Sequence, residues 1–332
     1  MQQILDPDPI YGVPVVQLAR LEDFRPAPED PERIYLLHIG DGMELAFLVN
    51  SIPGAQQDLR VGFHAAKGAS NTSRYYFSPV RSSRMSGSPY VLFSDPTLTL
   101  NPANRLSWYL GTPGVNPDDW MEAIVRTLLA TTRSEYVVTE GSSGGGFTSM
   151  RFAARFSHAV AVPRIPQTDI LRYGLLDPIR QTLRTAWPGM SYDDVMDGYS
   201  QRFRVVDLYS SPSWNRGNLI HYVHNTGDVR HTRSHLTPML EELGGKSQGN
   251  RALGGRIAVV RREIGPGHIG IPSKFWPIDT EVALARLKDL RPLGTAATTP
   301  TEPMFETPRS AIRDAHTMEK RAASAALHFR DF

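Results

Sequence analysis

The stretch from Glu135 to Phe156 constrains the fold of this 332-residue chain more than any other. It opens with a β-branched and aromatic run at residues 136–139, which predicts a buried strand. Gly141-Ser142-Ser143-Gly144-Gly145 follows directly, and the apolar residues of 147–154 then suit a helix packed on a sheet. A strand, a sharp glycine turn and a helix are the setting that exposes a nucleophilic serine, here Ser143.

Short apolar runs and helical patterns alternate along most of the chain. Strands are predicted at 34–39, 44–50, 59–63, 90–93, 159–162, 219–223 and 257–260, and helices at 117–129, 232–243 and 280–290. This alternation predicts an α/β fold, with a mostly parallel central sheet and helices on both faces. Ligands of such sheets bind beyond the carboxyl ends of the strands.

Changes in composition divide the chain into three regions. Residues 1–57 form an irregular, Pro- and acid-rich lead-in and a β-hairpin that turns at Gly40-Asp41-Gly42. Residues 58–291 form the α/β domain, in which 171–213 break the alternation and predict a helical insertion over the sheet edge. Residues 292–332 are a Thr- and Pro-rich linker with a polar tail.

Three predicted strand ends carry residues with catalytic chemistry, in the chain order Ser143, Asp228, His268. A serine hydroxyl becomes a good nucleophile when an imidazole removes its proton, and a carboxylate fixes the tautomer of that imidazole. The order serine, acid, histidine is that of α/β-hydrolases. Asp169 also follows a strand and remains an alternative acid. The backbone amides of Gly144 and Ala65 are the expected oxyanion donors, as they follow the serine and an earlier strand.

Four histidines, His221, His224, His231 and His235, cluster in the sequence around Asp228. The last two are spaced i, i+4 on the predicted helix and would face one metal ion together. No acidic ligand or His-Glu-x-x-His pattern accompanies them, so the sequence predicts no metal site. It predicts no cofactor either, and metal-dependent hydrolysis stays the less favoured alternative.

Composition excludes several other classes of protein. The chain has no cysteine, so disulfides, thiolate metal sites and cysteine nucleophiles are absent. A net charge of +2 and the lack of a basic run argue against nucleic acid as a partner. No signal peptide or membrane span is recognisable, and the expected location is the cytoplasm.

Several motifs together resemble one branch of a known superfamily. They are Ser94-Asp95-Pro96-Thr97-Leu98, Trp108-Tyr109-Leu110-Gly111, Gly141 to Phe147, Pro166-Gln167-Thr168-Asp169, Asn225 to His231, and Gly267-His268. They resemble bacterial α/β-hydrolases related to the O-acetyltransferase-like component of accessory secretion systems, which are often linked with surface glycans. The resemblance covers about residues 58–290. It implies acyl transfer or hydrolysis at an ester, with Ser143 as nucleophile, His268 as base and Asp228 as acid.

The leading hypothesis is therefore a serine esterase or O-acyltransferase that acts on an acylated small molecule or glycan. The second is a non-catalytic α/β-hydrolase-like partner in a glycan-modification or secretion assembly. The acyl group, the acceptor and the oligomeric state do not follow from the sequence.

Overall fold

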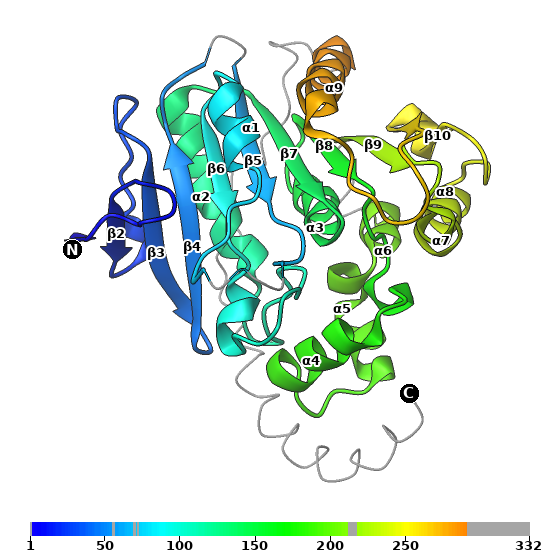
Figure 1. Ribbon diagram of the computed structural model, residues 1–332, viewed down its shortest axis with the longest axis horizontal. Coiled ribbons are helices and arrows are strands. Elements are labelled where there is room, and N and C mark those ends of the chain that lie inside the picture. Colours follow the sequence, from blue (N-terminus) through cyan, green and yellow to red (C-terminus); the bar gives the residue numbers. More distant parts are fainter. Residues whose placement is uncertain (1, 55–56, 69–70, 72, 212–217, 291–332) are drawn as a thin grey trace.

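The computed structural model describes residues 2–54, 57–68, 71, 73–211 and 218–290. They form one mixed sheet of eleven strands with helices around it, in the order β1-β2-β3-β4-β6-β5-β7-β8-β9-β11-β10 (Figure 1). The strands are β1 (Gln2–Leu5), β2 (Val15–Leu18), β3 (Arg33–Gly40), β4 (Met43–Asn50), β5 (Asp58–Phe63), β6 (Tyr90–Phe93), β7 (Tyr136–Ser142), β8 (Ala159–Arg164), β9 (Leu219–Asn225), β10 (Arg251–Ala252) and β11 (Ile257–Arg262). The α-helices are α1 (Val80–Met85), α2 (Pro117–Thr132), α3 (Gly144–Ala153), α4 (Leu176–Ala186), α5 (Tyr192–Phe203), α6 (Val205–Ser210), α7 (Val229–His231), α8 (Thr237–Glu242) and α9 (Trp276–Leu290).

The centre of the sheet is parallel. Strands β6, β5, β7, β8, β9 and β11 all run in one direction. The predicted α/β class is thus confirmed, but the whole sheet is more mixed than expected. Antiparallel pairs join β1 to β2, β3 to β4, β4 to β6, and β10 to β11.

The N-terminal region extends this same sheet. The predicted hairpin is present as β3 and β4, and its turn places Asp41 and Gly42 at positive φ, 50° and 75°. Strand β4 then pairs with β6, with Phe47 opposite Phe93. The lead-in is less irregular than predicted, since it contains β1 and β2. Such short strands are easily missed, because pairing with a neighbouring strand, β2 for β1 and β3 for β2, supplies what their local pattern lacks.

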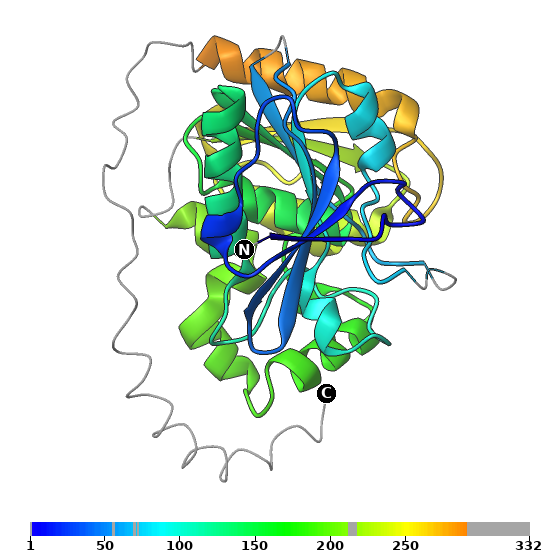
Figure 2. The ribbon, with the colours of Figure 1, turned by 90° about the vertical axis from the view of Figure 1, so that its left-hand side faces the viewer.

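Alternate side chains of the central strands enter separate cores on the two faces. On β7, Val137 belongs to the core that α2 and α3 cover, whereas Tyr136 and Val138 pack with α9. Figure 2 shows α1 and α2 on opposite sides of the sheet. The period of two in the sequence therefore appears directly as a sheet covered on both faces.

The predicted insertion is helical and contains α4, α5 and α6. Figure 1 shows α4 and α5 beyond the ends of the central strands. Trp187, just after α4, packs edge-on against Tyr199 and Phe203 of α5. The segment that carries α4 and α5 is closed at its base, where Asp169 forms an isolated antiparallel bridge with Arg204. The insertion is thus held close to the strand ends where the candidate residues lie.

The predicted linker and tail at 292–332 lie outside the described residues. Among the residues that are described, no helix combines the length and the apolar character needed to cross a membrane.

Candidate active site

Ser143 lies between β7 and α3 with a strained backbone. Its φ of 52° and ψ of −116° fall outside the regions that a residue with a side chain ordinarily adopts. The neighbouring glycines allow this turn. A Cβ on Gly141 would overlap the carbonyl of Gly145, and one on Gly145 would overlap the carbonyls of Phe63 and His64. The strand–turn–helix expected from the sequence is therefore present, with Ser143 at its apex.

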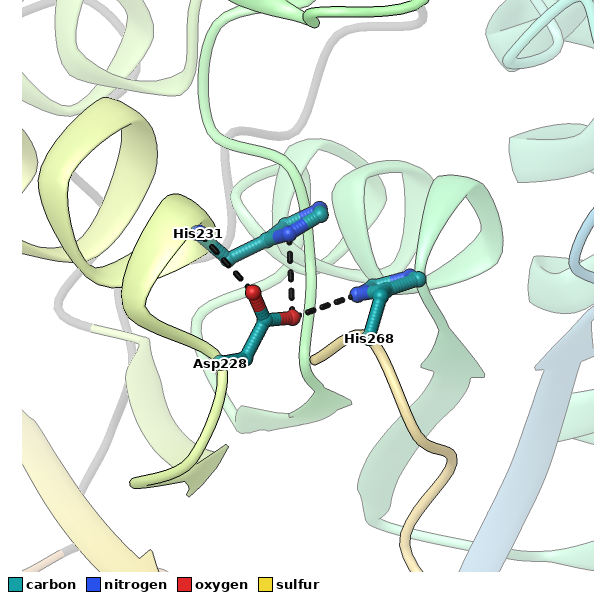
Figure 3. Close-up of side chains that lie close together, drawn as sticks. All are labelled: Asp228, His231 and His268. Carbon is teal, nitrogen blue, oxygen red and sulfur yellow. Dashed lines mark hydrogen bonds and ion pairs between the residues drawn. The ribbon is translucent and has the colours of Figure 1, made fainter. Parts of the chain in front are cut away.

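The structure brings Ser143, His268 and Asp228 into one hydrogen-bonded line. His268 Nε2 lies 3.0 Å from Ser143 Oγ, and His268 Nδ1 lies 2.7 Å from Asp228 Oδ2. Figure 3 shows the Asp228 carboxylate between His268 and a second imidazole, that of His231. Asp228 begins α7 just after β9, and His268 follows β11, so neighbouring parallel strands deliver both side chains.

Asp228 is held in its ionised form. Its side chain is buried and its Oδ1 accepts a 3.0 Å hydrogen bond from the backbone amide of His231. Burial alone would raise the pKa of this carboxyl. The His231 amide and the hydrogen bond to His268 outweigh burial, and the pKa of Asp228 lies below its ordinary value.

The alternative acid, Asp169, is engaged elsewhere. Its Oδ2 lies 3.1 Å from Arg204 Nε and 3.3 Å from Arg172 Nε, and its Oδ1 accepts from the amide of Leu171. Burial raises the pKa of Asp169 in spite of these arginines. Asp169 therefore closes the base of the helical insertion, and Asp228 is the carboxylate in contact with His268.

The expected oxyanion donors lie on segments that meet beside Ser143. Gly144 is the first residue of α3, and its neighbour Gly145 lies against the end of β5, next to Ala65. The neutral His64 ring fixes this loop: Nδ1 contacts the Ala65 carbonyl at 2.6 Å, and Nε2 accepts from the Asp95 amide at 3.0 Å. Burial lowers the pKa of His64 to about 4, which keeps this arrangement at neutral pH.

Gln167 is part of the site, although no sequence pattern predicted a role for it. Its Nε2 donates to Ser143 Oγ at 2.8 Å and lies 3.3 Å from His231 Nε2. Its Oε1 accepts from Trp108 Nε1 at 3.3 Å, which fixes the orientation of the amide. Gln167 is fully buried. One sequence feature could have identified Gln167: it follows β8, and β8 pairs in parallel with β7, which leads to Ser143.

Of the four clustered histidines, His231 enters the site. Its Nδ1 lies 3.0 Å from Asp228 Oδ2, although the geometry is not that of an aligned hydrogen bond. Burial lowers the pKa of His231 to about 4 and that of His235 to about 3, so both rings are neutral near pH 7. The other two pack in the fold: His221 is buried on β9, and His224 Nε2 contacts Thr232 Oγ1 at 2.7 Å.

Within the described part of the chain, one group of side chains has ligand atoms close enough to hold a metal ion. It comprises Asp228, His231 and His268, with one ligand atom from each lying within 4.8 Å of the others. His235 is not a member of this group, although its ring centroid lies 4.9 Å from that of His231. His268 Nδ1 lies at hydrogen-bond distance from Asp228 Oδ2. This contact suits His268 as a general base as well as it would suit the two residues as metal ligands.

A cavity of about 410 Å³ lies beside His268. It is lined by the start of the helical insertion, the β9–α7 turn and the loop after β11: Tyr173, Leu175, Gly227, Asp228, Val229, Arg230, His231, Gly267 and His268.

No protein-family profile and no curated protein matches the sequence. The structure is similar to that of the capsule O-acetyltransferase of Neisseria meningitidis serogroup A, with a TM-score of 0.51, 15% identity, and coverage of 76% of this chain and 94% of that one. A mutant of that enzyme in complex with CoA gives a TM-score of 0.52 at the same identity and coverage. The Glycosylation Associate Protein (Gap123) complex from Streptococcus agalactiae aligns at a TM-score of 0.49 and 14% identity, over 76% of this chain and 46% of that one. At this low identity, the TM-scores of 0.52 and 0.51 for the capsule O-acetyltransferase structures show a shared fold and not a shared reaction.

Proposed function

We propose that this chain is a serine hydrolase or O-acyltransferase, which acts through an acyl-enzyme on an acylated small molecule or glycan. The observation that carries the proposal is the line from Ser143 Oγ through His268 to Asp228 Oδ2, with steps of 3.0 and 2.7 Å. A strained serine, an imidazole in contact with its hydroxyl and an ionised carboxylate behind that imidazole are what nucleophilic catalysis at an ester requires.

The first half of the reaction forms the acyl-enzyme. Ser143 Oγ attacks the acyl carbon while its proton passes to His268 Nε2, and Asp228 stabilises the imidazolium through Nδ1–H. The carbonyl oxygen becomes an oxyanion, for which the amides of Gly144 and Ala65 are the assigned donors. The Gly144 amide is the first of α3, and the positive end of a helix favours a negative charge there.

The first half ends when the bond from the acyl carbon to the leaving group breaks and the leaving atom takes the proton from His268. The second half resolves the acyl-enzyme and returns the proton to Ser143 Oγ as the acyl–Oγ bond breaks. Water or an alcohol attacks the acyl carbon, with His268 again as base, and gives a free acid or a new ester. The neighbouring capsule O-acetyltransferase was solved with CoA, and a thioester of that kind is the donor to test first for transfer.

The competing hypothesis is a non-catalytic partner in a glycan-modification or secretion assembly. A non-catalytic protein does not require a serine at a φ of 52° whose hydroxyl is hydrogen-bonded to an imidazole. The strain costs on the order of 1–3 kcal/mol and is ordinarily retained for a functional reason. The geometry therefore favours the enzyme.

Labelling with a fluorophosphonate probe tests the proposal. The wild type should be labelled and Ser143→Ala should not. Ser142→Ala is a matched control, because Ser142 is the adjacent residue and its hydroxyl donates to the Arg164 carbonyl instead. Labelling of Ser143→Ala as strong as that of the wild type would refute Ser143 as the nucleophile.

A further inference from the structure

The cavity beside His268 lies on a definite side of the site. In the proposed reaction, the proton on His268 passes to the atom that leaves the acyl carbon, and in the second half it comes from the attacking alcohol or water. The leaving or accepting group must therefore lie next to the His268 ring. The cavity is lined by His268 and its flanking Gly267, and Ser143 is not among its lining residues. It thus suits the alcohol or thiol portion of a substrate rather than the acyl group.

Arg230 stands at the wall of this cavity with an exposed side chain. Its guanidinium lies directly over Gly174, so close that a Cβ on that residue would overlap it. Within the described residues, Arg230 has no carboxylate partner. Two nearby arginines differ in this respect, because Arg172 and Arg204 both pair with Asp169 and Glu242.

Apart from Arg230 and the catalytic side, where Asp228, His231 and His268 lie, the side chains of the wall are apolar. Leu175 is 53% exposed and Val229 is 54% exposed, and the Tyr173 ring completes that side of the cavity. Exposed aliphatic side chains next to an unpaired guanidinium form a surface for a molecule that has an uncharged body and a negative end.

We propose that this cavity binds the leaving or accepting group of the substrate, and that this group carries a phosphate or a carboxylate which pairs with Arg230. The inference rests on the proposed function and adds to it a class of substrate. In the step concerned, the acyl C–O or C–S bond breaks, its electron pair stays on the leaving atom, and that atom takes the proton from His268. Arg230 takes no part in this proton transfer and acts by binding alone.

Two matched pairs of acetyl donors test the inference. The first is acetyl-CoA with its short uncharged analogue S-acetyl-N-acetylcysteamine. The second is 4-acetoxybenzoate with its methyl ester. In the wild type, kcat/KM should be higher for the charged member of at least one pair. Arg230→Gln should lower the charged-to-uncharged ratio of that pair about tenfold, mainly through KM, as for the loss of a charge-assisted hydrogen bond. An effect on the first pair identifies the leaving group as a thiol that carries phosphate. An effect on the second pair identifies it as an alcohol that carries a carboxylate.

Arg233→Gln is the matched control, since Arg233 is an exposed arginine three residues further on that does not line the cavity. It should leave both ratios unchanged. Equal ratios in the wild type and Arg230→Gln for both pairs would overturn the inference, while labelling of Ser143 would leave the proposed function standing.

A second measurement judges the inference even if Ser143 is not catalytic. Binding of CoA and of 4-hydroxybenzoate to Ser143→Ala should weaken about tenfold when Arg230→Gln is added. No dependence of either affinity on Arg230 would overturn the inference, whatever the labelling experiment shows.

Discussion

His231 stacks on His268, with ring centroids 3.9 Å apart and ring planes 13° from parallel. Both rings approach the same oxygen, Asp228 Oδ2. Burial lowers the pKa of His231 to about 4, so this ring is neutral near pH 7. In the proposed reaction we therefore expect His231 to act as a positioning residue, which fixes the plane of His268 and adds no second positive charge.

The stack predicts which substitutions of His231 are tolerated. His231→Ala should lower kcat about fivefold, in line with the free energy of an aromatic pair. His231→Phe keeps a ring on His268 and should recover most of this loss. Steady-state kinetics with a neutral ester, with circular dichroism to check folding, would measure both. If Phe is as harmful as Ala, stacking is not the contribution of His231.

Asp228 and Asp169 should differ sharply when each is replaced by Asn. Asp228→Asn should lower kcat/KM by about three to four orders of magnitude with the fold intact, because His268 loses the group that fixes its tautomer. Asp169→Asn weakens the pairs with Arg204 and Arg172, and should lower the melting temperature more than kcat. The opposite pattern would show that the acid is wrongly assigned.

Gln167 should matter through its N–H donor to Ser143. Gln167→Glu keeps the acceptor for Trp108 Nε1 and replaces that donor by a carboxylate oxygen. We expect kcat to fall about tenfold to a hundredfold with little change in KM, the size expected for a lost hydrogen bond in a buried site. Unchanged kcat in a folded variant would limit Gln167 to packing.

Metal ions should inhibit this protein rather than activate it. Zn²⁺ bound by Asp228, His231 and His268 would occupy the carboxylate and imidazole that act on Ser143. Esterase activity should survive EDTA and fall as zinc is added. His231→Ala should weaken the inhibition, whereas His235→Gln should not, since His235 is outside that group. Activity that disappears on chelation and returns with zinc would instead support the metal-dependent alternative.

Stability should fall in mild acid because several buried histidines are held neutral. Burial lowers the pKa to about 4 for His64, His221, His224 and His231, and to about 3 for His235. An unfolded histidine titrates near pH 6.5, so between about pH 6.5 and 4 the unfolded chain binds more protons. Stability from these groups is complete above that window and is lost as the pH falls through it. Asp95, whose pKa burial raises to about 6, opposes this trend.

His221 is the residue with which to check this. Both of its ring nitrogens are buried, and neither has a hydrogen-bond partner among the residues that the structure describes. His221→Leu removes a group that must stay unprotonated and leaves no partner unpaired. Its melting temperature should fall less between pH 6.5 and 4.5 than that of the wild type. Parallel curves for the two proteins would show that His221 does not contribute to the acid sensitivity.

The sequence located the site because local signals marked it. Gly141 and Gly145 with Ser143 between them specify a turn, and the acid and base follow strands that are neighbours in a parallel sheet. Strand ends of one direction lie along one edge, so the three side chains were expected to meet. A different signal, the break in the alternation of strands and helices, predicted the insertion at 171–213.

What the sequence did not reveal depends on register and on where a helix starts. Gln167 reaches Ser143 because Ser142 pairs with Arg164 across β7 and β8, which no local pattern specifies. The i, i+4 spacing pairs His231 with His235, and their ring centroids lie 4.9 Å apart. It does not place His231 beside Asp228, because the helix is expected to begin at about residue 232. It begins at Val229 with Asp228 as its N-cap, and this earlier start turns His231 toward Asp228.

Gly141 and Gly145, on either side of Ser143, distinguish loss of catalysis from loss of the fold in evolutionary relatives of this chain. A Cβ at position 141 or 145 would overlap backbone carbonyls that cannot move aside, so replacing either glycine disturbs the junction of strand and helix. Another small residue in place of Ser143 would have to adopt the same strained φ, but it would meet no such steric overlap. Homologues that have lost catalysis should therefore keep both glycines and vary at the position of Ser143. A comparison of these three positions among homologues would distinguish inactive members from active ones.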